Sequence, residues 1–358
     1  MKYSLCITLR CNLNCQYCYL VKKNSTMPLQ TAREIIDFIF KKNPSGEKLC
    51  ISLSGGEPLL EVDLVKKITG IIENHPSYDK ENVEISVVTN GTVFSPETEK
   101  YLLDHKMRLC ISCDGPSQVH NIFRSFPNGE ESSSVVEKTL TRAKESFPDM
   151  SVHAVYHPRT LQYLPLVVEY FSSLGIRQIH LSPDLSAPWT RKETDLLSHI
   201  YPLIADRYIH YALQQKPHYI SIIDGKIAAI TQGGYNKSGQ KCRLGETGLA
   251  FTPSGNIYPC EKLIGNDSGE GHCIGNIYNG IRIEHVSDKK MPQFKTDSDC
   301  IFCDLKNYCM NWCVCSNYFS SGYYNRVGPF LCASEKIAIQ TALNVYRTLG
   351  ERLQTIPF

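Results

Sequence analysis

The stretch SLCITLRCNLNCQYCY, residues 4–19, joins an apolar run to three closely spaced cysteines. The run from Ser4 to Leu9 is short and apolar, which predicts a β-strand. Cys11, Cys15 and Cys18 follow it directly. We therefore expect all three thiols on the loop at the carboxyl end of the first strand, the edge at which α/β enzymes bind their ligands.

Strand and helix patterns alternate from this stretch to about residue 230. Five more apolar runs end at Gly, Pro or Asn, as strands do, and amphipathic stretches separate them. The strand-like runs lie at residues 49–58, 83–91, 108–116, 150–158 and 176–183, and the helical stretches at 31–42, 61–74, 96–105, 133–147 and 161–174. About six βα units predict a parallel sheet, either doubly wound or curled into a partial barrel. Residues 193–232 are predicted to be helical, and a last helix is expected at 334–349.

Composition excludes several classes of protein. The 358 residues include 38 Lys and Arg against 36 Asp and Glu, without long runs of one sign, so nucleic acid and anionic membranes are not indicated as partners. No apolar run approaches the ~18 residues needed to cross a bilayer. We expect a cytoplasmic protein that binds neither nucleic acid nor membrane.

The chain contains 16 cysteines, too many for an ordinary cytosolic enzyme, and it is too long and regular to need a disulfide framework. Metal binding is the remaining reason. Cys6, Cys50, Cys110 and Cys113 lie in apolar runs, where free cysteine behaves as a small buried hydrophobe. Three thiolates such as the opening group can hold three irons of a [4Fe–4S] cluster and leave one open. A structural zinc site is the alternative, but it prefers four ligands, and no nearby His or Cys supplies the fourth.

A second group of cysteines lies near the carboxyl end. It comprises Cys242, Cys260, Cys300, Cys303, Cys309, Cys313 and Cys332. Two short strands that turn at Ser254-Gly255 are expected to bring Cys260 back towards Cys242. Paired cysteines also make zinc knuckles, which stays the alternative to iron–sulfur clusters here.

The motif CNLNCQYCY resembles the signature of radical S-adenosylmethionine enzymes, and the landmarks downstream follow that family's order over residues 1–230. Residues 231–358 resemble its SPASM extension. The resemblance implies an α/β fold, a partial (β/α)6 barrel followed by a small cysteine-rich domain and a C-terminal helix. It also implies that the open iron chelates S-adenosyl-L-methionine, which an electron from the cluster splits to a 5′-deoxyadenosyl radical that abstracts hydrogen.

The resemblance assigns roles to residues at the ends of the predicted strands. The GGE motif is expected to hold the methionine amino group, the serine after the fourth strand the ribose, and an arginine the methionine carboxylate, since a guanidinium matches a carboxylate as a fork. The predicted cofactor-binding residues are Tyr17, Gly55, Gly56, Glu57, Asn90, Ser112, Arg124 and Leu181. The alternatives are plain turns at SGGEP and TNG, a surface role for Arg124 and a core role for Leu181.

In the SPASM pattern two further [4Fe–4S] clusters are implied, which makes three in all. Cys300, Cys303, Cys309 and Cys332 would bind the outer one, and Cys242, Cys260 and Cys313 the inner one. Cys273 is our candidate for the fourth inner ligand. Alternatively, Cys315 serves, or that iron stays open for substrate.

Members of this group act mostly on peptides or proteins, so we predict a ribosomally made peptide as substrate and a cross-link, a thioether, as product. Sulfatase maturases carry aspartate directly after the cysteine equivalent to Cys260, and Glu261 stands here instead. Glu261 is either the base that removes a proton from the substrate radical or a solvated surface residue. The alternatives are a sulfatase-maturing enzyme that forms formylglycine and, in another class, a non-catalytic iron–sulfur electron carrier or zinc scaffold.

Two expectations concern partners. A low-potential electron donor such as flavodoxin or ferredoxin is expected to reduce the clusters. The first strand starts at once, so no separate N-terminal recognition domain is expected, and any peptide leader must be read by the body or by a partner.

Overall fold

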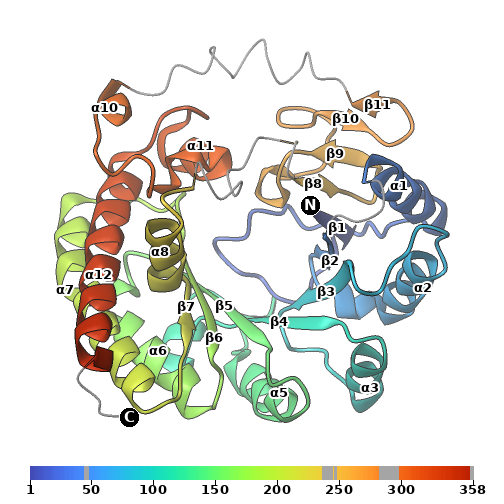
Figure 1. Ribbon diagram of the computed structural model, residues 1–358. Helices are drawn as coiled ribbons and strands as arrows, with labels where there is room; N and C mark the ends of the chain where they lie inside the picture. Colours follow the sequence, from blue (N-terminus) through green and yellow to red (C-terminus); the bar gives the residue numbers. More distant parts are fainter. Residues whose placement is uncertain (44–47, 236–244, 246–247, 282–297, 355–358) are drawn as a thin grey trace. The chain divides into compact units, whose positions relative to one another are not determined.

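Four parallel strands follow one another in the first of two compact units of the computed structural model (Figure 1). They are β1 (Lys2–Thr8), β2 (Leu49–Gly55), β3 (Val83–Thr89) and β4 (Arg108–Ser112), paired in that order. This unit comprises Met1–Ser112, Asn121–Met150 and Cys242–Lys290, and the second comprises Cys113–His120, Ser151–Lys241 and Met291–Phe358. The structure describes residues 1–43, 48–235, 245, 248–281 and 298–354, so the predicted ligand Cys242 lies outside the described residues. The predicted division at residue 230 stays a prediction.

Side chains alternate in size along these strands. Ile51 and Leu53 are fully buried on one face of β2, and Ser52 and Ser54 stand on the other because successive side chains of a strand point to opposite faces. The register places Ser4, Ser52 and Ser86 side by side on β1, β2 and β3. Small polar side chains therefore line one face of the sheet.

The helices of this unit bury their apolar stripes against the sheet (Figure 1). They are α1 (Leu29–Lys42), α2 (Val62–Glu73), α3 (Pro96–Asp104) and α5 (Ser133–Ser146), with a 3₁₀ turn η1 at Pro58–Glu61. The start of α3 shows the local cause: the Ser95 hydroxyl accepts from the Thr98 N–H at 3.1 Å, and Pro96 follows in the first turn, both typical of helix starts. The four predicted helices are found with their ends shifted by two residues at most.

The cysteine-rich part of the sequence contributes strands to the same sheet. β8 (Gly248–Phe251) pairs in parallel with β1, and β9 (Asn256–Tyr258), β10 (Gly275–Asn276) and β11 (Gly280–Ile281) continue antiparallel. The expected turn at Ser254-Gly255 is present, with Gly255 at a φ of 75°, a value that favours glycine. The backbone edge of β1 is therefore covered by β8, which removes an exposed pairing edge.

The second unit repeats the βα pattern and adds the C-terminal helix. Its strands β5 (Ser151–Tyr156), β6 (Gln178–Pro183) and β7 (Tyr219–Ile220) are parallel. Its helices are α4 (Ser117–His120), α6 (Leu164–Ser173), α7 (Arg191–Leu213), α8 (Ser221–Thr231), α10 (Ser298–Ile301), α11 (Val314–Ser321) and α12 (Pro329–Gln354), with 3₁₀ turns η2 (Leu161–Tyr163) and η4 (Met310–Trp312). α12 packs along α7 and α8 (Figure 1), with Ile339 and Ala342 buried. The expected last helix is thus present and longer than predicted.

The prediction that residues 193–232 are helical is confirmed for α7 and α8, and it is wrong only for residues 214–220 between them. α7 ends at Leu213, Gln215 adopts a left-handed φ of 57°, and β7 intervenes before α8. Pro217 explains part of the break, because proline and the residue before it disfavour helix. The two-residue strand was missed because it is too short to show an alternating pattern.

Candidate functional site

The three cysteines of the opening motif lie on the loop that follows β1, as predicted. Cys11 and Cys15 are half-buried, and Cys18 is exposed. Backbone hydrogen bonds hold the loop on two sides: the Glu57 N–H donates to the Arg10 carbonyl at 2.8 Å, and the Asn14 N–H to the Ser125 carbonyl at 2.7 Å. The loop is thus fixed at the carboxyl edge of the sheet.

Gly55 and Gly56 are required by this loop itself. A Cβ on Gly56 would lie 2.1 Å from the Arg10 carbonyl oxygen, and one on Gly55 would lie 2.3 Å from that of Thr8. Gly55 also has a φ of 135°, which side chains rarely allow. The two glycines therefore let β2 end directly against the cysteine loop, while their predicted contact with a ligand stays a prediction.

Glu57 is fully buried, and both of its carboxylate oxygens accept hydrogen bonds. One oxygen accepts from the Thr89 hydroxyl at 2.8 Å and the Leu59 N–H at 2.9 Å, and the other from the Asn90 N–H at 2.6 Å. Burial raises the pKa of Glu57 to about 7, although these hydrogen bonds oppose the rise. Glu57 thus ties the end of β2 to the end of β3, and its cofactor role stays a prediction.

Asn90 lies against the first cysteine. Its side-chain amide donates to the side-chain oxygen Oδ1 of Asn12 at 2.9 Å and to the Cys11 sulfur at 3.8 Å, and the Leu13 N–H donates to that sulfur at 3.4 Å. Burial raises the pKa of Cys11 to about 11, so a bound metal is needed to hold it as a thiolate at neutral pH. Asn12 was not predicted, because an asparagine between two cysteines looks like any loop residue.

Arg124 and Tyr17 converge on the second cysteine. Arg124 is only 7% exposed, its Nη1 lies 4.0 Å from the Cys15 sulfur, and its guanidinium stands 5.3 Å from the centre of the Tyr17 ring. The Tyr17 ring packs in turn on Phe123 at 5.6 Å. A buried guanidinium beside a thiol loop provides positive charge both for thiolates and for a carboxylate ligand.

Ser112 and Leu181 are the two remaining predicted cofactor residues. Ser112 ends β4 half-buried at the carboxyl edge of the sheet. Leu181 belongs to the second unit and is 4% exposed on the same face of β6 as Ile179, with its N–H bonded to the Ser221 hydroxyl at 2.9 Å. Its surroundings are those of a core leucine, and contact with adenine stays a prediction.

A late segment of the chain forms a third support of the opening loop. The Val21 N–H donates to the Gly265 carbonyl at 2.9 Å, and the Lys23 ammonium donates to the Asn266 carbonyl. Leu20, two residues after Cys18, also forms a parallel β-bridge with Gly265. The segment that directly follows Glu261 therefore lies against the opening loop, although it is about 240 residues away in sequence.

Cys260 and Cys273 follow the hairpin in the first unit. Both are half-buried, and the Cys273 thiol donates to the Gly275 carbonyl at 3.1 Å. Cys273 packs against a buried cluster that includes Cys6 and Tyr258. Cys6, Cys110 and Cys113 are buried as expected, and Cys315 is buried in α11. The structure brings Cys260 and Cys273 into one unit, while Cys313 belongs to the other.

The other predicted ligands lie in the second unit. Cys300, Cys303 and Cys309 lie on and after α10, Cys332 lies in the first turn of α12, and all four are half-buried. The Cys303 N–H donates to the Cys300 carbonyl at 3.3 Å. Burial, with the nearby Cys303 as a smaller cause, raises the pKa of Cys332. Four thiols from one loop and one helix suit an iron–sulfur cluster by their chemistry.

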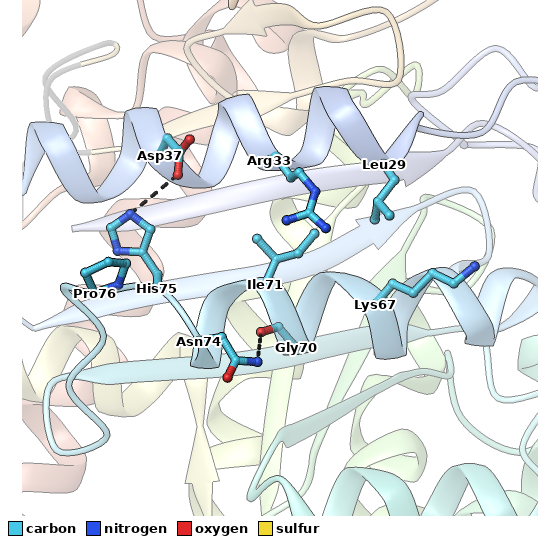
Figure 2. Close-up of a pocket in the computed structure, with 9 residues that line it drawn as sticks. All are labelled: Leu29, Arg33, Asp37, Lys67, Gly70, Ile71, Asn74, His75 and Pro76. Carbon is cyan, nitrogen blue, oxygen red and sulfur yellow. Dashed lines mark hydrogen bonds and ion pairs between the residues drawn. The ribbon is translucent and has the colours of Figure 1, made fainter.

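Within the described residues, no three His, Cys, Asp or Glu side chains converge on a point that one metal ion would fill. A cavity of about 400 Å³ lies outside the cysteine sites, between α1 and α2 of the first unit (Figure 2). It is lined by Leu29, Arg33, Asp37, Lys67, Gly70, Ile71, Asn74, His75 and Pro76. None of the predicted site residues reaches it.

No helix among the described residues is long and apolar enough to cross a membrane.

A parallel sheet with a three-thiol loop at its carboxyl edge, flanked by a buried arginine, defines an α/β enzyme that uses an iron–sulfur cluster. Residues 5–171 match the Radical SAM superfamily. This match shows that the chain contains a radical SAM domain, and the protein is an enzyme that uses a [4Fe–4S] cluster and S-adenosylmethionine.

Known proteins resemble nearly the whole chain. A cysteine-type anaerobic sulfatase-maturating enzyme of Clostridium perfringens is 22% identical over 328 residues, 85% of each chain. The solved structure of anSMEcpe with bound AdoMet and Cp18Cys peptide superposes with a TM-score of 0.79 at 20% identity, over 98% of this chain and 99% of that one. Streptococcus suis SuiB bound to its precursor peptide SuiA gives 0.62 at 14%, over 92% and 75%. These likenesses confirm the expected fold class, a radical SAM barrel with a cysteine-rich extension and a C-terminal helix.

Proposed function

We propose that this radical SAM enzyme modifies a ribosomally made peptide and closes a cross-link in it, a thioether from a peptide cysteine. The observation that supports a radical site here is that Asn90 and Arg124 contact sulfurs of the cysteine loop, with Arg124 also packed on the Tyr17 ring of that loop. A surface arginine or a plain turn would not be buried against those sulfurs. A bare electron carrier or zinc scaffold would not need this arrangement.

The residues of the chain have distinct roles in this proposal. Cys11, Cys15 and Cys18 hold three irons, and Arg124 binds the methionine carboxylate as a charge-assisted pair. Asn90 and the Leu13 N–H stabilise negative charge on the Cys11 sulfur. When bound, three [4Fe–4S] clusters and S-adenosylmethionine supply a hydrogen-abstracting radical and take up the one electron left after the new bond has formed.

A peptide substrate is supported by two similar solved structures that contain a bound peptide, anSMEcpe with the Cp18Cys peptide and SuiB with its precursor peptide SuiA. A thioether forms when the S–H and C–H bonds of the peptide break and a C–S bond is made. One hydrogen atom leaves in the radical step, and the remaining proton needs a base. Glu261 directly follows Cys260 and stands four residues before Gly265, whose carbonyl accepts from Val21 of the opening loop, and it is our candidate for that base. An external flavodoxin or ferredoxin would supply the reducing electron.

Formylglycine formation is the second candidate, because a sulfatase-maturating enzyme resembles 85% of this chain. Glu261 in place of the maturases' aspartate argues against it. The two reactions leave different products: a thioether removes two hydrogens and one alkylatable thiol, whereas formylglycine replaces the thiol with an aldehyde.

Mass spectrometry of a candidate peptide after anaerobic co-expression separates the two outcomes. The peptide encoded beside this enzyme is the first to test. We expect the loss of two hydrogens and of one iodoacetamide-reactive thiol, with Glu261→Gln slowing the modification. An aldehyde trapped by hydrazide would identify a sulfatase maturase. Peptide left unmodified while S-adenosylmethionine is cleaved would contradict this substrate class.

A further inference from the structure

A buried ion pair lies under the second cysteine group. The Lys226 ammonium of α8 lies 2.5 Å from a Glu335 carboxylate oxygen of α12, and both side chains are more than nine-tenths buried. Buried pairs of this kind often stabilise a fold no more than apolar residues of the same size would. Its presence therefore indicates a role beyond packing.

The two charges bind the backbone on either side of Cys309. The Lys226 ammonium donates to the Tyr308 carbonyl at 3.5 Å, and the Glu335 carboxylate accepts from the Met310 N–H at 2.5 Å. The sequence alone did not predict this arrangement, because Lys226 and Glu335 look like ordinary helix positions.

The same pair is joined to a second predicted ligand. Cys332 and Glu335 stand three positions apart on α12, so their side chains lie on the same face of that helix. α8 also contacts the cysteine loop, since the Tyr235 N–H after its end donates to the Asn307 carbonyl at 2.9 Å. A Cβ on Gly234 would lie 3.0 Å from Asn307. The pair thus joins the loop that carries Cys309 to the helix that carries Cys332.

We propose that Lys226 and Glu335 are positioning residues that fix Cys309 and Cys332 for the outer cluster and set its reduction potential. The inference rests on the proposed function, since it takes these cysteines as cluster ligands. Reduction adds one negative charge to a cluster, so a nearby buried cation favours the reduced form and a nearby carboxylate opposes it. The two residues therefore act on the potential with opposite signs.

The test is an EPR-monitored redox titration of the reconstituted holoenzyme. The Cys303→Ala variant first identifies the outer cluster as the signal that disappears. If Cys303→Ala removes neither iron nor a signal, the outer cluster of the proposed function does not exist, and this inference fails with it.

With that signal assigned, Lys226→Met should disfavour reduction at least tenfold, about 59 mV for one electron. Glu335→Gln should favour it, and the double variant should return close to wild type. Glu335→Gln keeps an oxygen that accepts from the Met310 N–H, so it changes charge more than anchoring. If Lys226→Met fails to assemble the cluster, the shift between Glu335→Gln and the double variant measures the same charge.

The matched control is Arg347→Met, which removes an equal charge from an exposed position of α12 that lies 15 residues beyond Cys332. Solvent screens that charge, so its shift should be much smaller. Lys226→Arg should keep both the cluster and the potential. The inference would be overturned if the potentials do not move, if they move with one sign in Lys226→Met and Glu335→Gln, or if they move as much in Arg347→Met.

Discussion

The two cysteine loops are held by different forces. The loop after β1 is fixed by backbone hydrogen bonds to Arg10, Asn14 and Val21, and polar hydrogens of Asn90 and Arg124 point at its sulfurs. The loop around Cys309 is fixed through the Lys226–Glu335 pair. The first arrangement places the buried Arg124 guanidinium beside the Cys15 thiol, a charge that suits a small acid as ligand. The second arrangement pairs its cation with a buried carboxylate.

Removing the opening thiols should have the largest effect, because it abolishes the first cysteine loop's function and spares the second loop. Replacing Cys11, Cys15 and Cys18 with Ala should remove one cluster and all cleavage of S-adenosylmethionine, while the iron bound through the second group remains. Iron analysis and assay of 5′-deoxyadenosine measure both effects. Tightly bound zinc and no iron after anaerobic purification of the wild type would contradict the assignment.

Gly56→Ala should damage the first loop alone. The added Cβ would meet the Arg10 carbonyl at 2.1 Å, so the backbone must shift, at an expected cost of about 3 kcal/mol or more. Gly70→Ala is the matched control, because a Cβ there meets nothing within 4 Å inside α2. That control should stabilise the helix by about 1 kcal/mol. Thermal unfolding followed with iron content compares them, and equal effects of the two changes would refute the close-approach argument.

Glu57 gives the first loop a pH dependence. Its pKa is raised to about 7 in the folded protein, from 4.5, so the folded state binds the proton more tightly than the unfolded state does. This stabilising contribution is complete below pH 4.5 and is lost as pH rises through 7, by up to about 3 kcal/mol. Glu57→Gln should remove this pH dependence of stability. The measurement is the difference in melting temperature between the wild type and Glu57→Gln, taken at pH 5 and again at pH 7.5. Parallel pH profiles would show that Glu57 is not protonated in this range.

Arg124→Ala should weaken S-adenosylmethionine binding by about 1.5–3 kcal/mol, or one to two decades in Kd, because a buried carboxylate loses its charge-assisted partner. Arg33→Ala, at the cavity between α1 and α2 (Figure 2), removes the same charge far from any predicted site residue. That control should leave the Kd unchanged. Equilibrium dialysis of the reconstituted enzyme measures both, and an unchanged Kd for Arg124→Ala would remove it from the cofactor site.

The sequence predicted features that repeat or that carry their own chemistry. Alternation found β1 to β6 and the helices between them, and spacing found the cysteines. It failed where the cause lies far away in the chain. β7 was missed because it depends on pairing with β6, and β8, expected as one of the two short strands, was not predicted to pair with β1. The saturation of Glu57 by Thr89 and Asn90 also required the fold, because nothing in SGGEP shows what will lie beside it.

The pairing of β1 with β8 has a consequence for synthesis on the ribosome. Lys2 to Leu5 must wait for Gly248 to Phe251, and at 5–20 residues per second that interval is about 10–50 s. Until then β1 has one open edge, and the segment at Gly265 has not yet reached the first thiols. Contacts so distant in sequence form slowly. Iron delivered during this interval would meet a loop still open on one side, so cluster loading and the completion of the nascent chain are coupled in time.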